Sequence, residues 1–480
     1  MKKWWSVMAL FLLAMVFSAQ TPPKEDKPAF VPGEVVVKLK PTRSVGPGNA
    51  AEELASDMNL KLVRSLTPIP AVDAEEAAAS REVSAAGIIV VLKDSTGKDM
   101  EQLVQSLEAD DRVEYAEPNF FYYAFGTPND PQFNKLWGMN NTGQTGGTAD
   151  ADIDATEAWD VTTGDTGIIV GVIDTGVDYK HPDLAANMWT NPGEDAWTDP
   201  NSANTGNGID DDNNGYVDDW RGWDFINNDN DPFDDNGHGT HVSGTIGAVG
   251  NDGVGVAGVN WKVKIMPLKF LSGSGSGSLA AAVDAINYAN HFGVNLTNNS
   301  WGGGGRSQAL EDAITAANNA GSLFVAAAGN NGTDNDATAN FPSNYDVPNV
   351  LAVAAIDHKG DLANFGSGGG GGICGCAGAA LPSPGSNFGA TSVDLAAPGK
   401  DILSTTPNNG YSSFSGTSMA TPHVAGVAAL TLSKFGNLTN VQLKQRLMNS
   451  VDARPGLQSK TVTGGVINAF KAVSSPLAMR

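Results

Sequence analysis

The sequence is poor in cysteine. Its 480 residues contain only Cys374 and Cys376, which stand one residue apart in a glycine-rich stretch. Such a pair rarely forms a relaxed disulfide and cannot join distant parts of a fold, so a disulfide framework is excluded. We interpret Gly366–Gly385 as a flexible insertion, with a metal clip or a reactive thiol pair as the alternative. Stability must therefore come from other sources.

Basic residues are also scarce. The chain has 29 Lys and Arg against 53 Asp and Glu, which gives a formal charge of −24. This charge repels nucleic acids and anionic membranes, and it suits hard cations such as Ca²⁺. We therefore expect no nucleic-acid partner. The acidity indicates either cation binding or solubility alone, depending on where the acids lie.

No apolar run of membrane-spanning length follows residue 19. Before it, Met1–Lys3 carries two lysines, Trp4–Phe17 is apolar except for Ser6, and Ser18 and Ala19 are small. This pattern predicts a secretory signal peptide over residues 1–19, and the run is short for a bilayer crossing. We expect a secreted, extracellular protein with no membrane association in its mature form; an N-terminal membrane anchor is the alternative.

The next segment, residues 20–125, predicts a small domain of its own. Strand-like runs at 34–40, 87–94 and 113–125 alternate with amphipathic helical patterns at 50–58 and 98–110. Such alternation within about a hundred residues is typical of an α+β unit. The chain then becomes rich in Asn, Gly and Thr, which marks a boundary before a second domain over residues 126–480.

The second domain predicts an α/β fold, a parallel central sheet flanked by helices. Continuous apolar runs, typical of strands covered on both faces, lie at 168–174, 263–270, 294–300, 322–328 and 349–356. Helical patterns at 278–292 and 308–321 fall between them, the second closing on Gly321. In such sheets the chemistry lies beyond the carboxyl ends of the strands.

Three residues at such ends could form a catalytic unit. Asp174 ends a strand, His238 begins a helix after a glycine, and Ser418 lies at a helix start. A serine hydroxyl is a weak nucleophile until an imidazole removes its proton, and that imidazole needs an acceptor on its other nitrogen. Backbone N–H groups at the helix start, and the amide of Asn330, could stabilise an oxyanion. Taken singly, Asp174 could be a turn residue and Ser418 an N-cap.

The two histidines of the 234–248 stretch allow a metal site as the alternative. His238 and His241 are three residues apart, but Gly239 and Thr240 separate them and no glutamate is near. A zinc helix of the HExxH type needs that glutamate as its base, so zinc is disfavoured. We expect His241 and His423 to be buried structural residues, and His181, His291 and His358 to be surface or loop residues.

Four stretches in this order, VIDTGVD, NGHGTHVSGTI, AAAGN and SFSGTSMATPHVAG, resemble the motifs of the subtilisin-like serine peptidases. The resemblance covers residues 128–473 and implies a subtilisin-like fold with Asp174 as the orienting acid, His238 as the base, Ser418 as the nucleophile and Asn330 as the oxyanion donor. The implied substrate-binding residues are Ser300, Trp301, Gly302, Gly303, Ala327, Ala328, Gly329 and Asn340.

The same resemblance interprets the small domain as an inhibitor-type propeptide. It would template folding and be released by self-cleavage within residues 122–127. The aromatic residues there suggest a preference for large apolar side chains at P1, whose burial contributes about 1.5–3 kcal/mol.

The acids concentrate where a cation could bind. The segment from Glu194 to Asp235 holds twelve aspartates. Within it, alternate oxygen ligands follow a calcium loop as Asp210, Asp212, Asn214, the carbonyl of Tyr216 and Asp218, with Arg221 in place of the closing glutamate, so Asp219 or a residue from elsewhere must complete the shell. A solvated acidic loop is the alternative, and residues 227–236 are a second candidate. The family resemblance implies a further site from Asp183, Asp252 and the carbonyls of Val254 and Val256.

Together these expectations describe an exported, Ca²⁺-stabilised serine endopeptidase made as an autoprocessed zymogen. It would cleave proteins and peptides through an acyl-enzyme, be inhibited by its own propeptide, and act as a monomer. A catalytically idle calcium-binding or inhibitory scaffold and a zinc hydrolase are the competing hypotheses.

Overall fold

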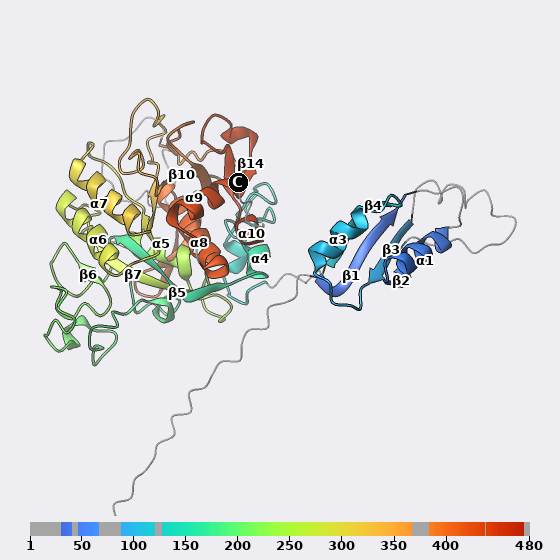
Figure 1. The fold of residues 1–480 in the computed structure, drawn as a ribbon. Helices are drawn as coiled ribbons and strands as arrows, with labels where there is room; N and C mark the ends of the chain where they lie inside the picture. The colour runs from blue at the N-terminus through green and yellow to red at the C-terminus, as the bar shows by residue number, and fades with distance from the viewer. Residues whose placement is uncertain are drawn as a thin grey trace, which may run out of the picture. The chain divides into compact units, whose positions relative to one another are not determined.

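The computed structural model describes residues 30–40, 47–66, 88–120, 127–366, 384–436 and 438–474. The chain forms two compact units, Met1–Ala124 and Phe125–Arg480. Figure 1 draws both as ribbons, and each is described by itself. The predicted signal peptide, the two cysteines and most of the predicted self-cleavage segment lie outside the described residues.

Within its described residues, the first unit is an antiparallel sheet with two helices. Its strands run in the order β2-β3-β1-β4. The elements are β1 (Phe30–Leu39), α1 (Pro47–Asp57), β2 (Lys61–Ser65), β3 (Ile88–Lys93), α3 (Met100–Glu108) and β4 (Val113–Phe120). Strand β2 was not predicted, because the sequence KLVRS is mostly polar and exposed at a sheet edge, where an apolar pattern is not required.

The core of the first unit joins both helices to the sheet. Leu54 of α1 and Leu103 of α3 pack with Val35 and Val37 of β1, and all four are buried. Helix α3 begins where the Asp99 carboxylate accepts the backbone N–H groups of Glu101 and Gln102. Such an N-cap satisfies N–H groups that have no partner inside the helix.

The second unit contains a nine-stranded sheet in the order β14-β15-β11-β10-β9-β8-β5-β7-β6, parallel except for the β14–β15 pair. Its strands are β5 (Gly164–Asp174), β6 (Trp223–Asp224), β7 (Lys262–Lys269), β8 (Leu296–Asn299), β9 (Leu323–Ala327), β10 (Val350–Ile356), β11 (Leu395–Pro398), β14 (Val451–Ala453) and β15 (Gly465–Ile467). A separate hairpin joins β12 (Ile402–Thr406) to β13 (Gly410–Phe414). The helices are α4 (Ala155–Trp159), α5 (His238–Gly247), α6 (Leu279–His291), α7 (Gln308–Asn319), α8 (Thr417–Phe435), α9 (Asn440–Asn449) and α10 (Ala469–Ser474).

Helices cover both faces of this sheet. Alternate side chains of β5 belong to different cores: Val172 packs in the core that includes α5 and α8, and Ile173 packs in the core that includes α6 and α7. In Figure 1, α6 and α7 lie side by side, apart from α8 and α9. The predicted parallel sheet flanked by helices is therefore confirmed, because strands buried on both faces are the ones that read as continuous apolar runs.

The sheet brings separate motifs to one edge. Asp174 ends β5, Ser300 follows β8, and Asn330 lies three residues after β9. Toward the end of the described residues, the short strand β15 is followed directly by helix α10. Within the described ranges, no helix has both the length and the apolar character that a bilayer crossing requires.

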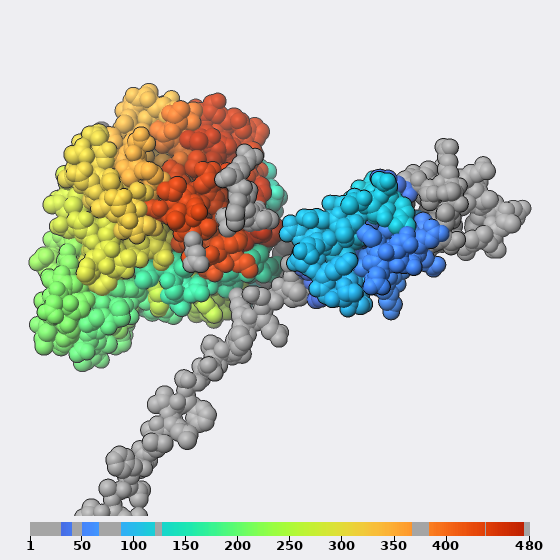
Figure 2. Space-filling model, in the orientation of Figure 1, coloured from blue at the N-terminus to red at the C-terminus, as the bar shows by residue number. Residues whose placement is uncertain are grey.

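The acidic segment has little regular structure. Between η2, which ends at Asn187, and α5 it contributes only the short strand β6 and a 3-10 turn. Aromatic contacts attach it to the unit: the Tyr216 ring packs edge-on against Trp223 and Tyr288, with centroids 5.0 Å away in each case. In Figure 2 this segment is the green region at the margin of the second unit. The acidic segment is therefore a surface region held to the rest of the unit by aromatic packing.

Candidate active site

The predicted acid and base are in direct contact. The Nδ1 atom of His238 lies 2.7 Å from Oδ1 of Asp174, and both side chains are buried. The same carboxylate oxygen accepts the backbone N–H of Thr175 at 2.7 Å. A bond at Nδ1 leaves Nε2 as the nitrogen that can accept a proton from a hydroxyl, which is the tautomer that base catalysis requires.

The start of α5 is shaped to bring the base to the acid. A side chain at Gly239 would place its Cβ 2.0 Å from the carbonyl oxygen of Gly176, so only glycine permits this approach of helix and strand end. The Asp234 carboxylate accepts the Thr240 N–H and the Thr175 hydroxyl, each at 2.8 Å. Because Thr175 follows the acid directly, the base-bearing helix and the acid-bearing strand share one hydrogen-bond network.

Ser418 lies at the second position of α8 and is buried with about 4% of its surface exposed. Its hydroxyl donates to the carbonyl oxygen of Ser300 at 3.0 Å, and the Ser300 hydroxyl donates to the Ser418 carbonyl at 2.9 Å. Segments 118 residues apart are thus joined in both directions. The N-terminus of α8 directs backbone N–H groups toward this place, where negative charge is favoured.

Asn330 is held against the same helix end. Its Oδ1 atom accepts both the N–H and the hydroxyl of Thr417, at 2.8 and 2.9 Å. Because this end of the amide is engaged, the NH₂ end is the one that can donate to a ligand. Thr417 is a residue that sequence reasoning missed, since nothing in the motif alone shows which side chain orients the amide.

The predicted substrate-binding residues converge around Asn340. A Cβ at Gly302 would lie 3.2 Å from the Asn340 amide nitrogen, and one at Gly329 would lie 3.2 Å from the Asn340 Cγ. The Gly303 N–H donates to the Phe341 carbonyl at 3.0 Å. The two glycine-containing segments that follow β8 and β9 therefore flank one polar side chain. Ala327 and Ala328 are buried, and the Trp301 ring packs edge-on against Phe270.

The other histidines have structural contacts. His241 is buried, stacks on Phe414 with centroids 4.4 Å apart, and lies 2.9 Å from the Ile402 carbonyl; burial lowers the pKa of its imidazole to about 3. His423 is buried as well and contacts the Met419 carbonyl at 2.9 Å, with its pKa lowered by burial to about 4. His181 was expected at the surface or in a loop; it is in a loop but buried, and burial lowers its pKa.

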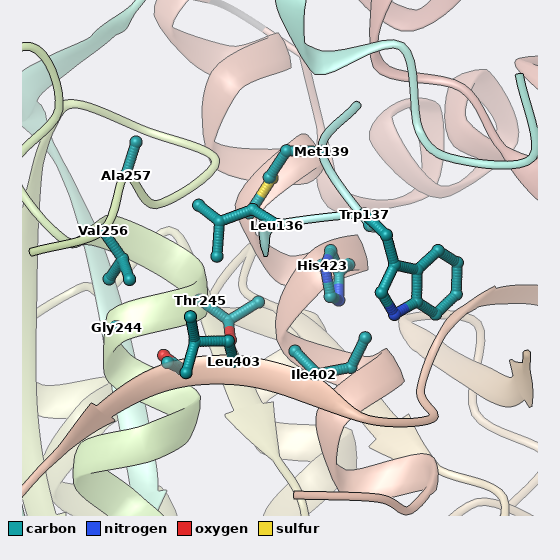
Figure 3. A pocket seen from close by; sticks show the side chains of 12 residues that line it. Leu136, Trp137, Met139, Gly244, Thr245, Val256, Ala257, Ile402, Leu403 and His423 are labelled. Carbon is teal, nitrogen blue, oxygen red and sulfur yellow. The ribbon is translucent and has the colours of Figure 1, made fainter. Parts of the chain in front are cut away.

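A small cavity is lined in part by residues of α5 and α8. It is shown in Figure 3, where His423 of α8 lies near Leu136 and Ile402. Its volume of about 10 Å³ is at the lower limit for one water molecule. The lining does not include Asp174, His238 or Ser418, so this cavity is not where a peptide would bind.

Two clusters of carboxylates could hold a cation. The first gathers Asp130, Asp183 and Asp252, whose oxygens lie within 4.8 Å of one another. One oxygen each of Asp130 and Asp183 is buried with no hydrogen-bond partner. Burial raises the pKa of Asp183 to about 7 and also raises that of Asp130. A hard divalent cation would offset the cost of these buried charges, so the residues fit Ca²⁺.

This first cluster differs in part from the prediction. Asp183 and Asp252 were predicted ligands, and Asp130 was missed, because it lies at the entry of the unit, 53 residues before Asp183. The Val256 N–H and the Tyr411 hydroxyl donate to Oδ2 of Asp183, at 2.9 and 3.0 Å. The loop containing Val254 and Val256 therefore lies at the site, as expected for carbonyl ligands.

The second cluster gathers Glu194 with Asp210 and Asp212. Glu194 supplies the oxygen from elsewhere that the loop pattern lacked; its Oε2 atom is buried without a hydrogen-bond partner, and burial raises its pKa to about 7. The amide of Asn214 donates to both Asp212 and Asp219. The donor set of carboxylates with an unpartnered oxygen again fits Ca²⁺.

One predicted ligand of this loop, Asp218, has its carboxylate engaged by backbone groups. The Asp218 carboxylate accepts the backbone N–H groups of Asn207 and Gly208, each at 2.8 Å, instead of joining the cluster. Asp218 has a positive φ of 57°, in the left-handed region that non-glycine residues rarely adopt. Tyr216 remains in the loop, with its N–H bonded to the Asn214 side chain.

The candidate over residues 227–236 is not assembled among the described residues. Its carboxylates have other partners: Asp231 accepts the Tyr179 hydroxyl at 2.8 Å, Asp234 accepts the Thr240 N–H in the first turn of α5 at 2.8 Å, and Asp235 pairs with Lys269 at 2.6 Å. These contacts hold the segment that leads to His238.

Comparisons with known proteins agree with this geometry. Residues 165–465 match the subtilase family, and residues 18–119 match the fervidolysin N-terminal prodomain. The thermophilic serine proteinase of Bacillus sp. (strain AK1) is 34% identical over 450 residues, which cover 94% of this chain and 89% of the relative. Thermitase of Thermoactinomyces vulgaris is 35% identical over 348 residues, which cover 72% of this chain and 99% of thermitase. A solved protease structure from Pseudoalteromonas arctica has 29% identity and a TM-score of 0.53, covering 72% of this chain and 99% of that one.

The family description covers more than half of the chain, so the chain belongs to the subtilase family, and the resemblance found in the sequence is confirmed. It is a subtilisin-like serine endopeptidase that carries an N-terminal prodomain.

Proposed function

We propose that Asp174, His238 and Ser418 are the catalytic triad of this endopeptidase and that Asn330 donates to the oxyanion. The contact of 2.7 Å between His238 and Asp174, buried at the carboxyl end of β5, is the observation that carries the proposal. This contact selects the tautomer of the imidazole: with the proton on Nδ1, bonded to the carboxylate, Nε2 is the nitrogen that acts as the base.

The reaction follows from these positions. When a substrate carbonyl enters, the Ser418 hydroxyl leaves the Ser300 carbonyl and passes its proton to Nε2 of His238 as its oxygen bonds to the carbonyl carbon. The Asn330 amide and the first N–H groups of α8 stabilise the negative oxygen. His238 then gives the proton to the leaving amine as the C–N bond breaks, and a water molecule, activated by the same imidazole, hydrolyses the acyl-enzyme.

The substrate is a polypeptide in an extended conformation. Residues 300–303 and 327–329 offer backbone on either side of Asn340, with Gly302 and Gly303 exposed. Glycines allow a substrate main chain to approach closely. We propose a large apolar P1 side chain, bound between the two segments with Asn340 at the base.

We further propose that the enzyme is exported, monomeric and stabilised by Ca²⁺. Residues 1–19 would be the signal peptide and residues 20–125 an inhibitory propeptide, which the enzyme removes within residues 122–127. Ca²⁺ bound in each of the two carboxylate clusters would supply positive charge. One ion would stabilise the loop at Asp183 and another the loop at Glu194, without disulfides.

Labelling with a fluorophosphonate tests the catalytic assignment. The full-length chain should become labelled on Ser418 and process itself, whereas Ser418→Ala should remain unlabelled, inactive and of precursor size. An idle scaffold would show no labelling in either protein. A zinc hydrolase would lose activity with a chelator and keep it in Ser418→Ala, and either result would refute the triad.

A further inference from the structure

Lys269 is a buried lysine that the proposed triad does not explain. It is the last residue of β7, directly opposite Asp174 of the neighbouring strand β5, and only 2% of its side chain is exposed. A buried ammonium is unfavourable unless each of its N–H groups has an acceptor. Its position beside the proposed acid therefore needs a reason.

All three N–H groups of this ammonium have acceptors. The Lys269 Nζ atom lies 2.7 Å from the Thr175 carbonyl, 2.6 Å from Oδ1 of Asp235 and 3.0 Å from the Leu271 carbonyl. An ammonium has three donors, so the arrangement is complete. A different rotamer of Lys269 would lose at least one of these three bonds, so they favour one position of the side chain.

Two of these acceptors belong to the segments that carry the proposed acid and base. Thr175 follows Asp174 directly, and Asp235 is three residues before His238. The third acceptor, Leu271, also donates its N–H to the Asp174 carbonyl at 3.1 Å. The ammonium thus joins the end of β5 to the segment that begins α5, in addition to the Thr175–Asp234 hydrogen bond.

We propose that Lys269 is a positioning residue for the Asp174–His238 pair and that Asp235 is its counterion. The inference rests on the proposed triad. By holding the Thr175 carbonyl and the Asp235 carboxylate together, Lys269 keeps the His238 ring within bonding distance of Asp174 during proton transfer. A misplacement of about 1 Å in such a site costs roughly a hundredfold in rate.

The chain offers a matched control on the same strand. Lys264 of β7 also donates to two carbonyls, those of Ala186 and Met188, each at 3.1 Å, but it lies far along the strand from Asp174. For the carboxylate, Asp284 of α6 is an exposed residue of equal charge. Lys264→Met and Asp284→Asn therefore remove like groups without touching the proposed bridge.

The experiment compares kcat and KM of Lys269→Met and Asp235→Asn with these controls, using full-length, self-processed enzyme and active-site titration with a fluorophosphonate. We expect kcat to fall about ten- to a hundredfold in Lys269→Met and by a smaller factor in Asp235→Asn, with KM within about twofold. Both controls should keep the parent kcat.

Charge alone predicts a different pattern. Removing a nearby cation stabilises the imidazolium and would raise or preserve kcat, whereas removing a nearby anion would lower it. A fall in both variants supports positioning, and changes of opposite sign overturn it. Asp235 is 57% exposed, so Asp235→Asn should fold even if Lys269→Met does not. In that variant, a lower kcat with an unchanged pH profile of kcat/KM supports positioning, whereas an unchanged kcat, or a lower kcat with a shifted pH profile, overturns the proposal. Activity in Ser418→Ala would instead refute the triad itself.

Discussion

The Asn330 side-chain oxygen accepts two hydrogen bonds from one residue, the N–H and the hydroxyl of Thr417, at 2.8 and 2.9 Å. Thr417 precedes the proposed nucleophile, so the amide is aligned by the same helix end that carries Ser418. Preorganised donors of this kind stabilise charge that develops only in the transition state.

Replacing Asn330 by Ala should therefore lower kcat by about 10²–10³, the range known for such donors in serine proteases, with little change in KM. Steady-state hydrolysis of a peptide anilide measures both. Thr417→Val removes one of the two bonds that orient the amide, and its kcat should lie between those of the parent and Asn330→Ala. An Asn330→Ala enzyme of undiminished kcat would show that the amide is not a donor to the oxyanion.

Asp174→Asn should keep the position of the His238 ring while changing which of its nitrogens carries the proton. The amide can keep the contact with Nδ1 of His238, but it can donate its own N–H and so favour a proton on Nε2, where the base must be empty. We expect kcat to fall roughly 10⁴-fold. Thermal unfolding of the same variant in the Ser418→Ala background should remain near the parent value, and a large drop there would mean that lost folding explains the inactivity.

Asp130 should contribute to the first calcium site. In the Ser418→Ala background, which avoids self-digestion, Ca²⁺ at about a hundredfold excess over its dissociation constant should raise the free energy of unfolding by about 2.7 kcal/mol for one site. Asp130→Asn should reduce the difference between the melting temperatures in Ca²⁺ and in EDTA, whereas Asp284→Asn on α6 should leave it unchanged. Equal melting temperatures of the parent in both conditions would remove the calcium claim.

Substitutions of Glu194 and Asp218 should have different effects on Ca²⁺ binding at the second site. Glu194→Gln should lose one equivalent of bound Ca²⁺ in equilibrium dialysis, because its buried oxygen lies in the carboxylate cluster. Asp218→Asn should keep that equivalent, since its carboxylate accepts backbone N–H groups outside the cluster. The reverse result would favour the ligand set read from the loop sequence.

The buried imidazoles predict acid sensitivity. Burial lowers the pKa of His423 to about 4, whereas an unfolded histidine titrates near 6.5. Below about pH 6.5 the unfolded chain therefore takes up a proton that the folded chain refuses, and the free energy of unfolding falls by about 1.4 kcal/mol per pH unit until the folded pKa is reached. His241, with a pKa of about 3, acts in the same direction.

Urea unfolding of the Ser418→Ala protein between pH 7 and pH 4.5, with Ca²⁺ present, measures this loss. His423→Gln should reduce its slope, because the glutamine amide can still donate to the Met419 carbonyl without titrating. The exposed His291 provides the control, and His291→Gln should leave the slope as it is. A His423→Gln slope equal to that of the parent would contradict the prediction.

The long elements were predictable because their signals are local. The strands β5, β7, β9 and β10 are apolar over most of their length, and helices α6 and α7 repeat apolar residues at helical spacing. Strands β2 and β6 were missed for the opposite reason. They are short, and β6 pairs over only two residues, so contacts with neighbouring strands, and not their own composition, make them strands.

The properties of the site residues can be divided in the same way, into those that the local sequence predicts and those that depend on contacts between distant residues. The sequence by itself determined the family, the chemical type of each proposed catalytic group and the strand or helix end at which it stands, because these depend on residue identity and short-range order. Only the tertiary structure decided which groups meet: that Asp130 joins Asp183, that Glu194 and not Asp218 joins Asp212, and that Lys269 bridges Thr175 to Asp235. These contacts join residues far apart in the chain, and their partners are selected by packing of the whole sheet, which no local pattern encodes.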